Sequence, residues 1–206
     1  MSIKIEVTLD KTIGQITNFF DTSIKYDLAV KSARQALNKT ATGLKSFSRR
    51  QITGHLKMKA KEAGDKIRIK RATGRDLVMM ESLVMFSGAP LPLIQFVTGS
   101  KNPRPQKGIK VRRRKKVKVE IVRGRKITEP SAFIAKAKRK GFPTQVFRRK
   151  STATGPTAMQ AAPSIAQVII NKRNIRDRIE RHAGARLVKE FNSAYNNNLA
   201  RLSELK

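Results

Sequence analysis

The sequence predicts an α+β fold, with antiparallel β-hairpins in the middle of the chain and helices on both sides of them. Two observations support the helices: apolar residues recur at helical spacing in residues 28–56 and again in residues 175–202. A third supports the sheet, because short segments between them alternate apolar and polar residues with a period of two. We therefore expect N-terminal helices and a long C-terminal helix packed on an antiparallel sheet.

The chain has 206 residues, which is enough for one domain with a sizeable core. We expect a single domain over residues 1–206 with four parts. These are a mainly helical part (1–56), a basic β region (66–150), a linker rich in small residues with two prolines (151–164), and the C-terminal helix (165–206).

The N-terminal part begins with a predicted strand at residues 3–9, where isoleucine, valine and leucine alternate with polar residues. Apolar residues at positions 13–20 then fall at helical spacing. A second helix is predicted from about Asp27 to Gly43, because glycine is a common helix end. A third, short helix is expected around residues 47–56.

Strands are predicted next at residues 66–72 and 77–86. Residues 88–97 contain two prolines, which exclude a helix interior and indicate an extended edge segment. Residues 100–108 have the composition of a loop.

Residues 111–126, VRRRKKVKVEIVRGRK, hold nine Lys and Arg and a single acid, Glu120. Val117, Val119 and Ile121 alternate with polar residues, which favours a strand over a disordered basic tail. RKITEP follows Gly124 and completes a predicted hairpin. SAFIAKA (131–137) and TQVFRRK (144–150) predict another.

The positive charge is concentrated in this β region. Residues 101–150 carry 20 Lys and Arg against two acids, more than half of the net charge of +32. So large an excess repels itself and predicts an acidic partner surface or a polyanion. The candidate partner- or DNA-contacting residues are Arg112, Arg113, Arg114, Lys115, Lys116, Lys118, Arg123, Arg125, Lys126, Lys138, Arg139, Lys140, Arg148 and Arg149.

The C-terminal helix has an apolar stripe with four-residue spacing from Ile175 to Leu199. Because a helix has 3.6 residues per turn, this stripe must wrap slowly around it. Together with two hairpin aromatics, the stripe supplies the candidates for packing between subunits: Phe133, Phe147, Ile175, Ile179, Leu187 and Phe191.

Catalytic, metal and cofactor sites are not expected. The only histidines, His55 and His182, are far apart in the sequence, and no nucleophile, phosphate-loop or metalloprotease motif is present. Cysteine is absent, and carboxylates do not cluster. No segment has the apolar length of a membrane span or a secretory signal, so a membrane partner is not expected either.

One function class that remains open is a small basic nucleic-acid-binding protein, nucleoid-like or ribosome-associated. Aromatic residues are scarce and no zinc-finger, homeodomain or RNP1-like pattern occurs, which argues against sequence-specific recognition. Nonspecific contact with phosphates is compatible with the charge. A protein of this class would carry a flexible basic arm.

The other class, a structural virion protein, follows from a resemblance. PLPLIQF, the basic strands of GIKVRRRKKVKVEIVRGRK, SAFIAKAK and VFRR at 146–149 resemble the minor tail protein Z family of tailed bacteriophages. The Ala-rich segment AVKSARQALNKTATGLKS is similar to the N-terminal helix of that family. Where the family carries GPS before its last helix, this chain has GPT at 155–157.

The resemblance implies a non-enzymatic tail completion protein. Such a protein acts at the head-proximal end of the tail, in tail maturation, head–tail joining and DNA positioning. It implies a homo-oligomeric ring, a hexamer by the sixfold symmetry of tails, in contact with tail terminator, tail tube and neck or head completion proteins. Contact with genomic DNA is a further possible interaction. The protein would lie in the virion, and in the host cytoplasm during assembly.

Overall fold

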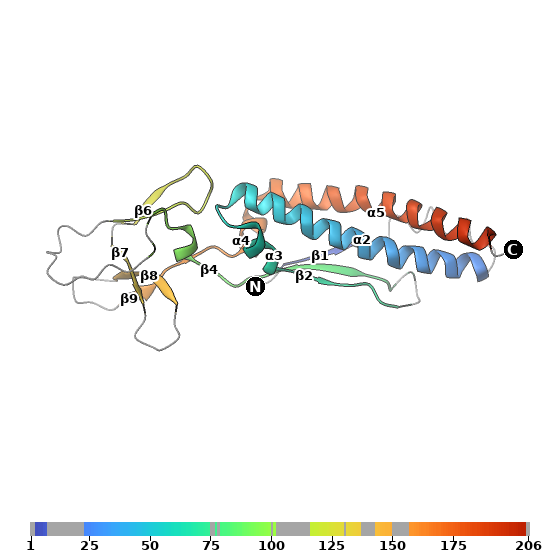
Figure 1. Cartoon of the computed structure of the whole chain (residues 1–206), viewed down its shortest axis with the longest axis horizontal. Coiled ribbons are helices and arrows are strands. Elements are labelled where there is room, and N and C mark those ends of the chain that lie inside the picture. Colours follow the sequence, from blue (N-terminus) through green and yellow to red (C-terminus); the bar gives the residue numbers. More distant parts are fainter. Residues whose placement is uncertain are drawn as a thin grey trace.

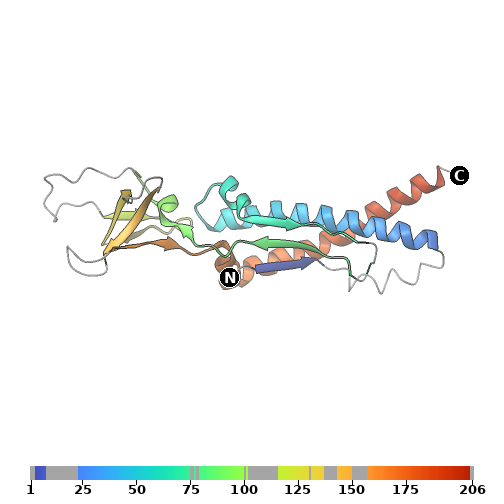
Figure 2. The ribbon, with the colours of Figure 1, turned by 90° about the horizontal axis from the view of Figure 1, so that it is seen from below.

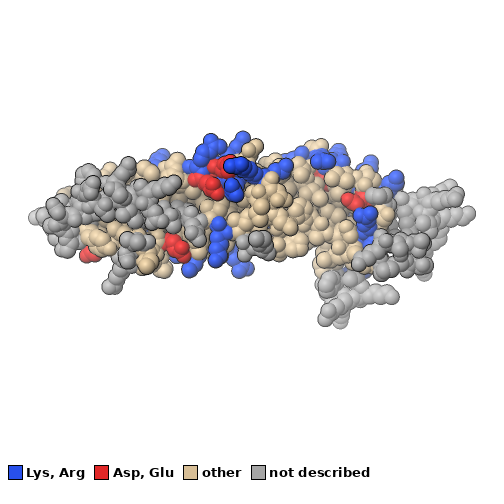
Figure 3. Space-filling view, turned by 180° about the vertical axis from the view of Figure 1, so that it is seen from behind, with Lys and Arg blue, Asp and Glu red and all other residues tan. Residues whose placement is uncertain are grey.

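The molecule is elongated, with two long helices along one end and small β-sheets at the other (Figures 1 and 2). The space-filling view has the same long outline (Figure 3). This computed structural model describes residues 3–7, 23–74, 77, 79–99, 101, 116–129, 131–136, 143–149 and 157–204. The predicted helix at 13–20 and nearly all of the predicted loop at 100–108 lie outside these residues.

The helices are α2 (Ser23–His55), α3 (Ala60–Asp65), α4 (Ile165–Asn171) and α5 (Arg173–Ser203), with a 3-10 helix η2 (Leu93–Phe96). The strands are β1 (Ile3–Val7), β2 (Ile67–Lys70), β3 (Ser82–Phe86), β4 (Leu91–Pro92), β5 (Val117–Val119), β6 (Ile127–Glu129), β7 (Ala132–Lys136), β8 (Thr144–Arg149), β9 (Thr157–Met159) and β10 (Ala161–Ala162). The predicted α+β class is confirmed.

A three-stranded antiparallel sheet, in the order β1-β3-β2, lies along the helices. Phe86 of β3 faces Ile3 of β1 on one side and Ile67 of β2 on the other. The predicted strands at 3–9 and 66–72 are confirmed in β1 and β2. The predicted strand at 77–86 was too long, because only its second half pairs with both neighbours.

The predicted end of a helix at Gly43 is wrong. Helix α2 runs through this residue for 33 residues in all and includes the segment at 47–56. The guanidinium of Arg186 on α5 lies against Gly43, in the space that a Cβ atom at this position would occupy. Glycine leaves this space free, although it costs about 1 kcal/mol in a helix interior.

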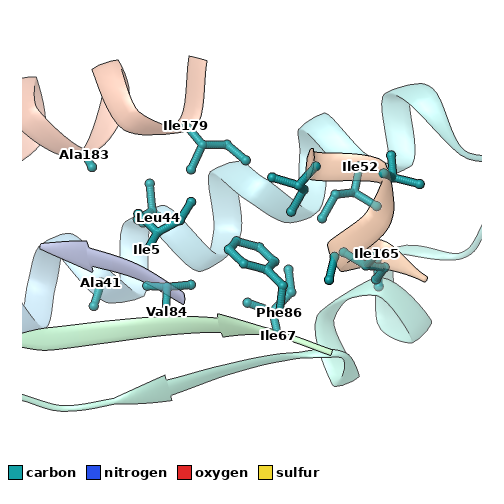
Figure 4. Packing of buried hydrophobic residues seen from close by; sticks show 14 of the residues in the cluster. Ile5, Ala41, Leu44, Ile52, Ile67, Val84, Phe86, Ile165, Ile179 and Ala183 are labelled. Carbon is teal, nitrogen blue, oxygen red and sulfur yellow. The ribbon is translucent and has the colours of Figure 1, made fainter. Parts of the chain in front are cut away.

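Helix α2 packs against α5 on one side and against the three-stranded sheet on another, while α5 also touches β1. Figure 4 shows Leu44 of α2, Val84 and Phe86 of β3, and Ile179 of α5 converging on one core. Ile165 of α4 extends this core toward the sheets at the other end. The long C-terminal helix thus packs mainly through α2.

Helix α4 begins with a reciprocal cap that precedes the long helix. Ser164 Oγ accepts a hydrogen bond from the Gln167 backbone N–H at 3.1 Å, and Gln167 Oε1 accepts one from the Ser164 N–H at 2.9 Å. The chain leaves helical geometry at Lys172, with φ −109° and ψ 79°, and α5 starts at the next residue. The predicted helix from about residue 174 is confirmed as α5.

The β end is built from the two predicted hairpins. β5 pairs with β6, and β7 pairs with β8, both antiparallel. The predicted linker at 151–164 contains two short strands instead, since β9 extends the β8 edge and β10 pairs with β4. Of the extended segment predicted at 88–97, only Leu91–Pro92 pairs as a strand, and the chain then turns into η2.

Candidate interaction surface

The basic hairpin β5–β6 is bound to the end of helix α2. Arg123 N–H donates to the His55 carbonyl at 2.9 Å, and Lys57 N–H donates to the Ile121 carbonyl at 2.9 Å. The guanidinium Nε of Arg123 also donates to the Thr53 carbonyl, at 2.6 Å. Carbonyls in the last turn of a helix have no partner within the helix, so these bonds satisfy groups that would otherwise need water. The hairpin is consequently an ordered part of the body.

The nearly buried carboxylate of Glu120 stabilises the junction between the basic hairpin and the segment that follows α2. Its side chain is 10% exposed, and Oε2 lies 2.5 Å from Nζ of Lys57. Oε1 accepts a hydrogen bond from the Gly124 N–H at 3.0 Å. The hydrogen bond from Lys57, followed by that from Gly124, lowers the pKa of the Glu120 carboxyl. Gly124 has φ +80°, which glycine adopts readily, so the turn can return its N–H to the carboxylate.

Strand β5 places its apolar side chains in the core and its charged side chain at the surface, as the sequence predicts. Val117 and Val119 are buried, whereas Lys118 between them is exposed. Val97, the residue after η2, forms an antiparallel backbone bridge with Val119. This bridge pairs the edge of β5 that does not face β6. The alternation therefore turns the lysine outward from an ordered strand.

The structure brings several predicted contact residues together on this hairpin. Lys116, Lys118, Arg123, Arg125 and Lys126 are exposed around β5 and β6. Arg148 is exposed on β8, in a different sheet. The positions outside the described residues are Arg112, Arg113, Arg114, Lys115, Lys138, Arg139 and Lys140, and the side chain of Arg149 is not described either. A contact role for all of these residues stays a prediction.

The predicted subunit-packing residues occupy two places. Ile179, Leu187 and Phe191 are buried within the chain's own core, and Ile175 packs against that core while partly exposed. Phe133 and Phe147 face each other across β7 and β8, with ring centroids 6.1 Å apart. Exposed apolar side chains on α5 are instead Val188 and Leu199, each 47% exposed. A role between subunits stays a prediction.

A second basic feature was not predicted from the sequence: a surface cavity of about 660 Å³ between α2, α3 and β2. Its lining includes Lys45, Arg49, Lys61 and Arg68, with Asp65 as the one carboxylate among its lining residues. The spacing of Lys45 and Arg49 places both on one face of a helix. Their juxtaposition with α3 and β2 depends on the tertiary fold.

The two histidines have different environments. His182 of α5 stacks on Phe47 of α2, with centroids 4.0 Å apart and an interplanar angle of 10°. The pKa of His182 is lowered mainly by its burial and further by the positive charges of Arg186 and Arg50. The pKa of His55, at the end of α2, is lowered mainly by burial and further by the positive charge of Lys172. The lowered pKa values favour the neutral form of both imidazoles, and the stacking on Phe47 makes His182 a packing group.

Among the residues that the structure describes, no group of three or more His, Cys, Asp or Glu side chains could hold a metal ion. None of the described helices is long and apolar enough to cross a membrane. Among the charged side chains of the described surface, cations are more numerous than acids. On the face in Figure 3, Lys and Arg side chains outnumber acidic ones and gather near the middle of the molecule.

Comparison with known proteins agrees with the resemblance in the sequence. The model of one family, prophage minor tail protein Z (GPZ), matches residues 16–204. No curated protein and no solved structure matches the chain. The match runs from before α2 to the last residues of α5, so it covers both the helical body and the basic β end. The chain belongs to the prophage minor tail protein Z family.

Proposed function

We propose that the protein is a tail completion protein, which binds the head-proximal end of a phage tail and makes it competent for joining to the head. Membership of the family supports a structural role in the phage tail. The attachment of the basic hairpin to the end of α2 through Arg123 supports the finer assignment, as does the ion pair between Lys57 and Glu120. A docking surface needs charges in fixed positions, and this junction supplies them.

The charge of the hairpin indicates the chemistry of the partner. Within the described residues, Lys116, Lys118, Arg125 and Lys126 form no ion pair, so their charge is available to a neighbour. An acidic surface would steer association and fix orientation. Tail terminator, tail tube and neck or head completion proteins are the proposed partners. The end of the genomic DNA is a further polyanion within reach of such a position.

We infer a ring of identical subunits, with six copies to match the symmetry of tails. Copies that each carry a net charge of +32 repel one another, so such a ring would form on an acidic template more readily than in solution. The elongated body offers a long flank for contact between copies (Figure 1). The protein would work in the virion after assembly in the host cytoplasm, as a structural component without an enzymatic step.

The test is reconstitution on tails that were assembled without this protein. Purified protein is added, and the tails are imaged by negative-stain electron microscopy. The proposal predicts extra density at one end of each tail and recovery of joining to heads. Density along the tube or at the distal end would overturn the assignment. Tight binding to nucleic acid at physiological salt, with no attachment to tails, would favour the nucleoid-like or ribosome-associated alternative.

A further inference from the structure

The cavity between α2, α3 and β2 gathers positive charge from all three elements. Both α3 and β2 contact α2, and they lie beside the second half of that helix (Figures 1 and 2). The cations that line the cavity are Lys45 and Arg49 of α2, Lys61 of α3 and Arg68 of β2. Lys45 is partly buried and the other three are exposed. Against these four cations stands one carboxylate, that of Asp65.

These four cations are not neutralised within the described part of the chain. None of them forms an ion pair with another described residue. On α5, by contrast, Arg173, Arg176 and Arg186 each pair with an acid of the same helix. Like charges that are held close together repel one another, and a bound anion relieves this repulsion. The cavity is therefore arranged to receive negative charge from another molecule.

Two of the cations are positioned by helix α2 and its contact with α3. Lys45 and Arg49 are four residues apart, so they lie on the same face of α2, next to the cavity. The stem of Arg49 lies against α3, because a Cβ atom added to the buried Gly64 would touch its Cδ at 3.5 Å. A long side chain whose stem packs on the protein in this way keeps its charged end at the surface.

The cavity offers little apolar surface to a protein partner. Ile67 is 1% exposed and belongs to the core, and Ile69 is the only other large apolar residue among the described lining residues. Protein interfaces obtain most of their affinity from a few large side chains that fill well-packed pockets. Aromatic residues, on which unpaired bases stack, are also missing from this lining. The lining thus suits a ligand that is recognised by its charge alone.

We propose that this cavity binds backbone phosphates of double-stranded DNA, whatever the base sequence. Phosphate contacts require cations in fixed positions and no apolar pocket. A guanidinium can donate two parallel hydrogen bonds to one phosphate, and both Arg49 and Arg68 line the cavity. Lys45 and Lys61 add point charges beside them. A duplex fits better than a single strand, because the duplex keeps its bases stacked and needs no aromatic partner from the protein.

The inference gives the two basic surfaces different partners. The hairpin β5–β6 docks on acidic protein, and the cavity holds DNA. A second copy of this chain is a poor occupant of the cavity, since it has 46 Lys and Arg and only 14 Asp and Glu. The inference rests on the proposed function only in taking the end of the genome as the source of the DNA. It is measured with purified protein and a duplex, so it can fail while attachment to tails succeeds, and the reverse.

The test measures the affinity of the full-length protein for a short DNA duplex at several salt concentrations. A protein this basic binds any polyanion, but the salt dependence of the affinity counts the phosphates that it contacts. The double variant Lys45→Gln, Arg49→Gln should lower the slope of log affinity against log salt by about 1.8, since each lost contact removes roughly 0.9. The double variant Lys31→Gln, Arg34→Gln removes the same charge from exposed positions of the same helix and should leave the slope unchanged.

A variant that gains affinity makes the test independent of any loss of folding. Asp65→Asn removes the carboxylate that repels a phosphate at the cavity, so it should tighten binding of the duplex by about threefold. Asp27→Asn removes an exposed carboxylate near the start of α2 and is the matched control. It should leave the affinity nearly unchanged, because exposed charges far from the bound phosphates are screened by salt.

Equal salt slopes for the Lys45→Gln, Arg49→Gln variant and its control would overturn the proposal. Equal affinities of the Asp65→Asn and Asp27→Asn variants for the duplex would overturn it as well. A peptide rich in glutamate is the second probe. If the Lys45→Gln, Arg49→Gln variant binds this peptide more weakly but keeps the salt slope of the wild type for the duplex, the cavity is a docking site for an acidic protein instead.

Discussion

Asn198 of α5 donates a hydrogen bond to Oγ of Ser32 on α2 at 2.9 Å, although the two residues are 166 positions apart in the sequence. Both side chains are buried, and Ser32 in turn donates to the Leu28 carbonyl at 2.7 Å. This chain of bonds connects the beginning of α2 to the end of α5. A buried polar contact between two helices favours the one register that satisfies it.

Asn198→Ala is expected to lower the free energy of unfolding by about 1–2 kcal/mol, because it removes a buried hydrogen bond and some packing. Hydrogen exchange in the last turns of α5 should rise with it. Asn197→Ala, at an exposed neighbouring position, is the matched control and should have little effect. Equal effects of the two substitutions in denaturant unfolding would show that the contact contributes nothing.

Gly43→Ala is expected to change the free energy of unfolding by less than the roughly 1 kcal/mol that the helix preference of alanine would give. The added methyl group must displace the Arg186 guanidinium, which also lies 3.1 Å from Oε1 of Glu190, and this group is the end of a flexible side chain that can move aside. In an Arg186→Ala background the same substitution should stabilise by about 1 kcal/mol, because only the helix preference remains. A double-mutant cycle measures the difference between the two backgrounds. Additive effects would mean that the close approach has no energetic consequence.

Glu120→Gln is expected to destabilise the junction at neutral pH and to alter the acid dependence of stability. The folded pKa of Glu120 lies below its usual 4.5, so its contribution is complete above 4.5 and is lost as pH falls through the folded pKa. The difference in stability between wild type and variant should therefore shrink over that range. Glu81→Gln removes one carboxylate at an exposed position and is the control for the loss of charge. A difference that is constant with pH would refute the role of the ion pair.

His182→Gln is expected to weaken the pH dependence of stability on the acid side of 6.5. The folded pKa of His182 lies below 6.5, so the unfolded chain takes up a proton first as pH falls. Stability from the neutral stacked ring is complete above 6.5 and declines as pH falls toward the folded pKa. His55 acts in the same direction, so His182→Gln with His55→Gln should remove more of the dependence than either alone. Thermal unfolding of the wild type and the variants, measured from pH 7 downward, gives this pH dependence of stability.

The sequence predicted those features that depend on local pattern. The alternation around Lys118 indicated a strand with its charges outward, and the long apolar stripe from Ile175 indicated α5. The role of Gly43 could not be predicted, because it depends on an arginine that lies far away in the sequence. The same limit applies to the cavity beside β2, whose residues come from three elements.

The strands in the expected linker were missed for a related reason. Residues 157–159 and 161–162 are rich in small side chains and have weak strand propensity, yet they pair with β8 and β4, whose edges are formed elsewhere in the chain. The reciprocal cap of Ser164 and Gln167 was visible in the sequence as a serine followed three residues later by glutamine, and it would have located the start of α4.

The most direct test of the account is complementation of a phage that lacks this protein, with joining of heads to tails as the measurement. Lys116, Lys118, Arg125 and Lys126 are replaced together by Gln, and the control carries Gln at four exposed cations on the two long helices: Lys31, Arg34, Lys39 and Lys189. We expect folded protein in both cases, with joining lost only for the hairpin variant. Equal joining by both variants would contradict the proposal that the ordered basic hairpin is the docking surface.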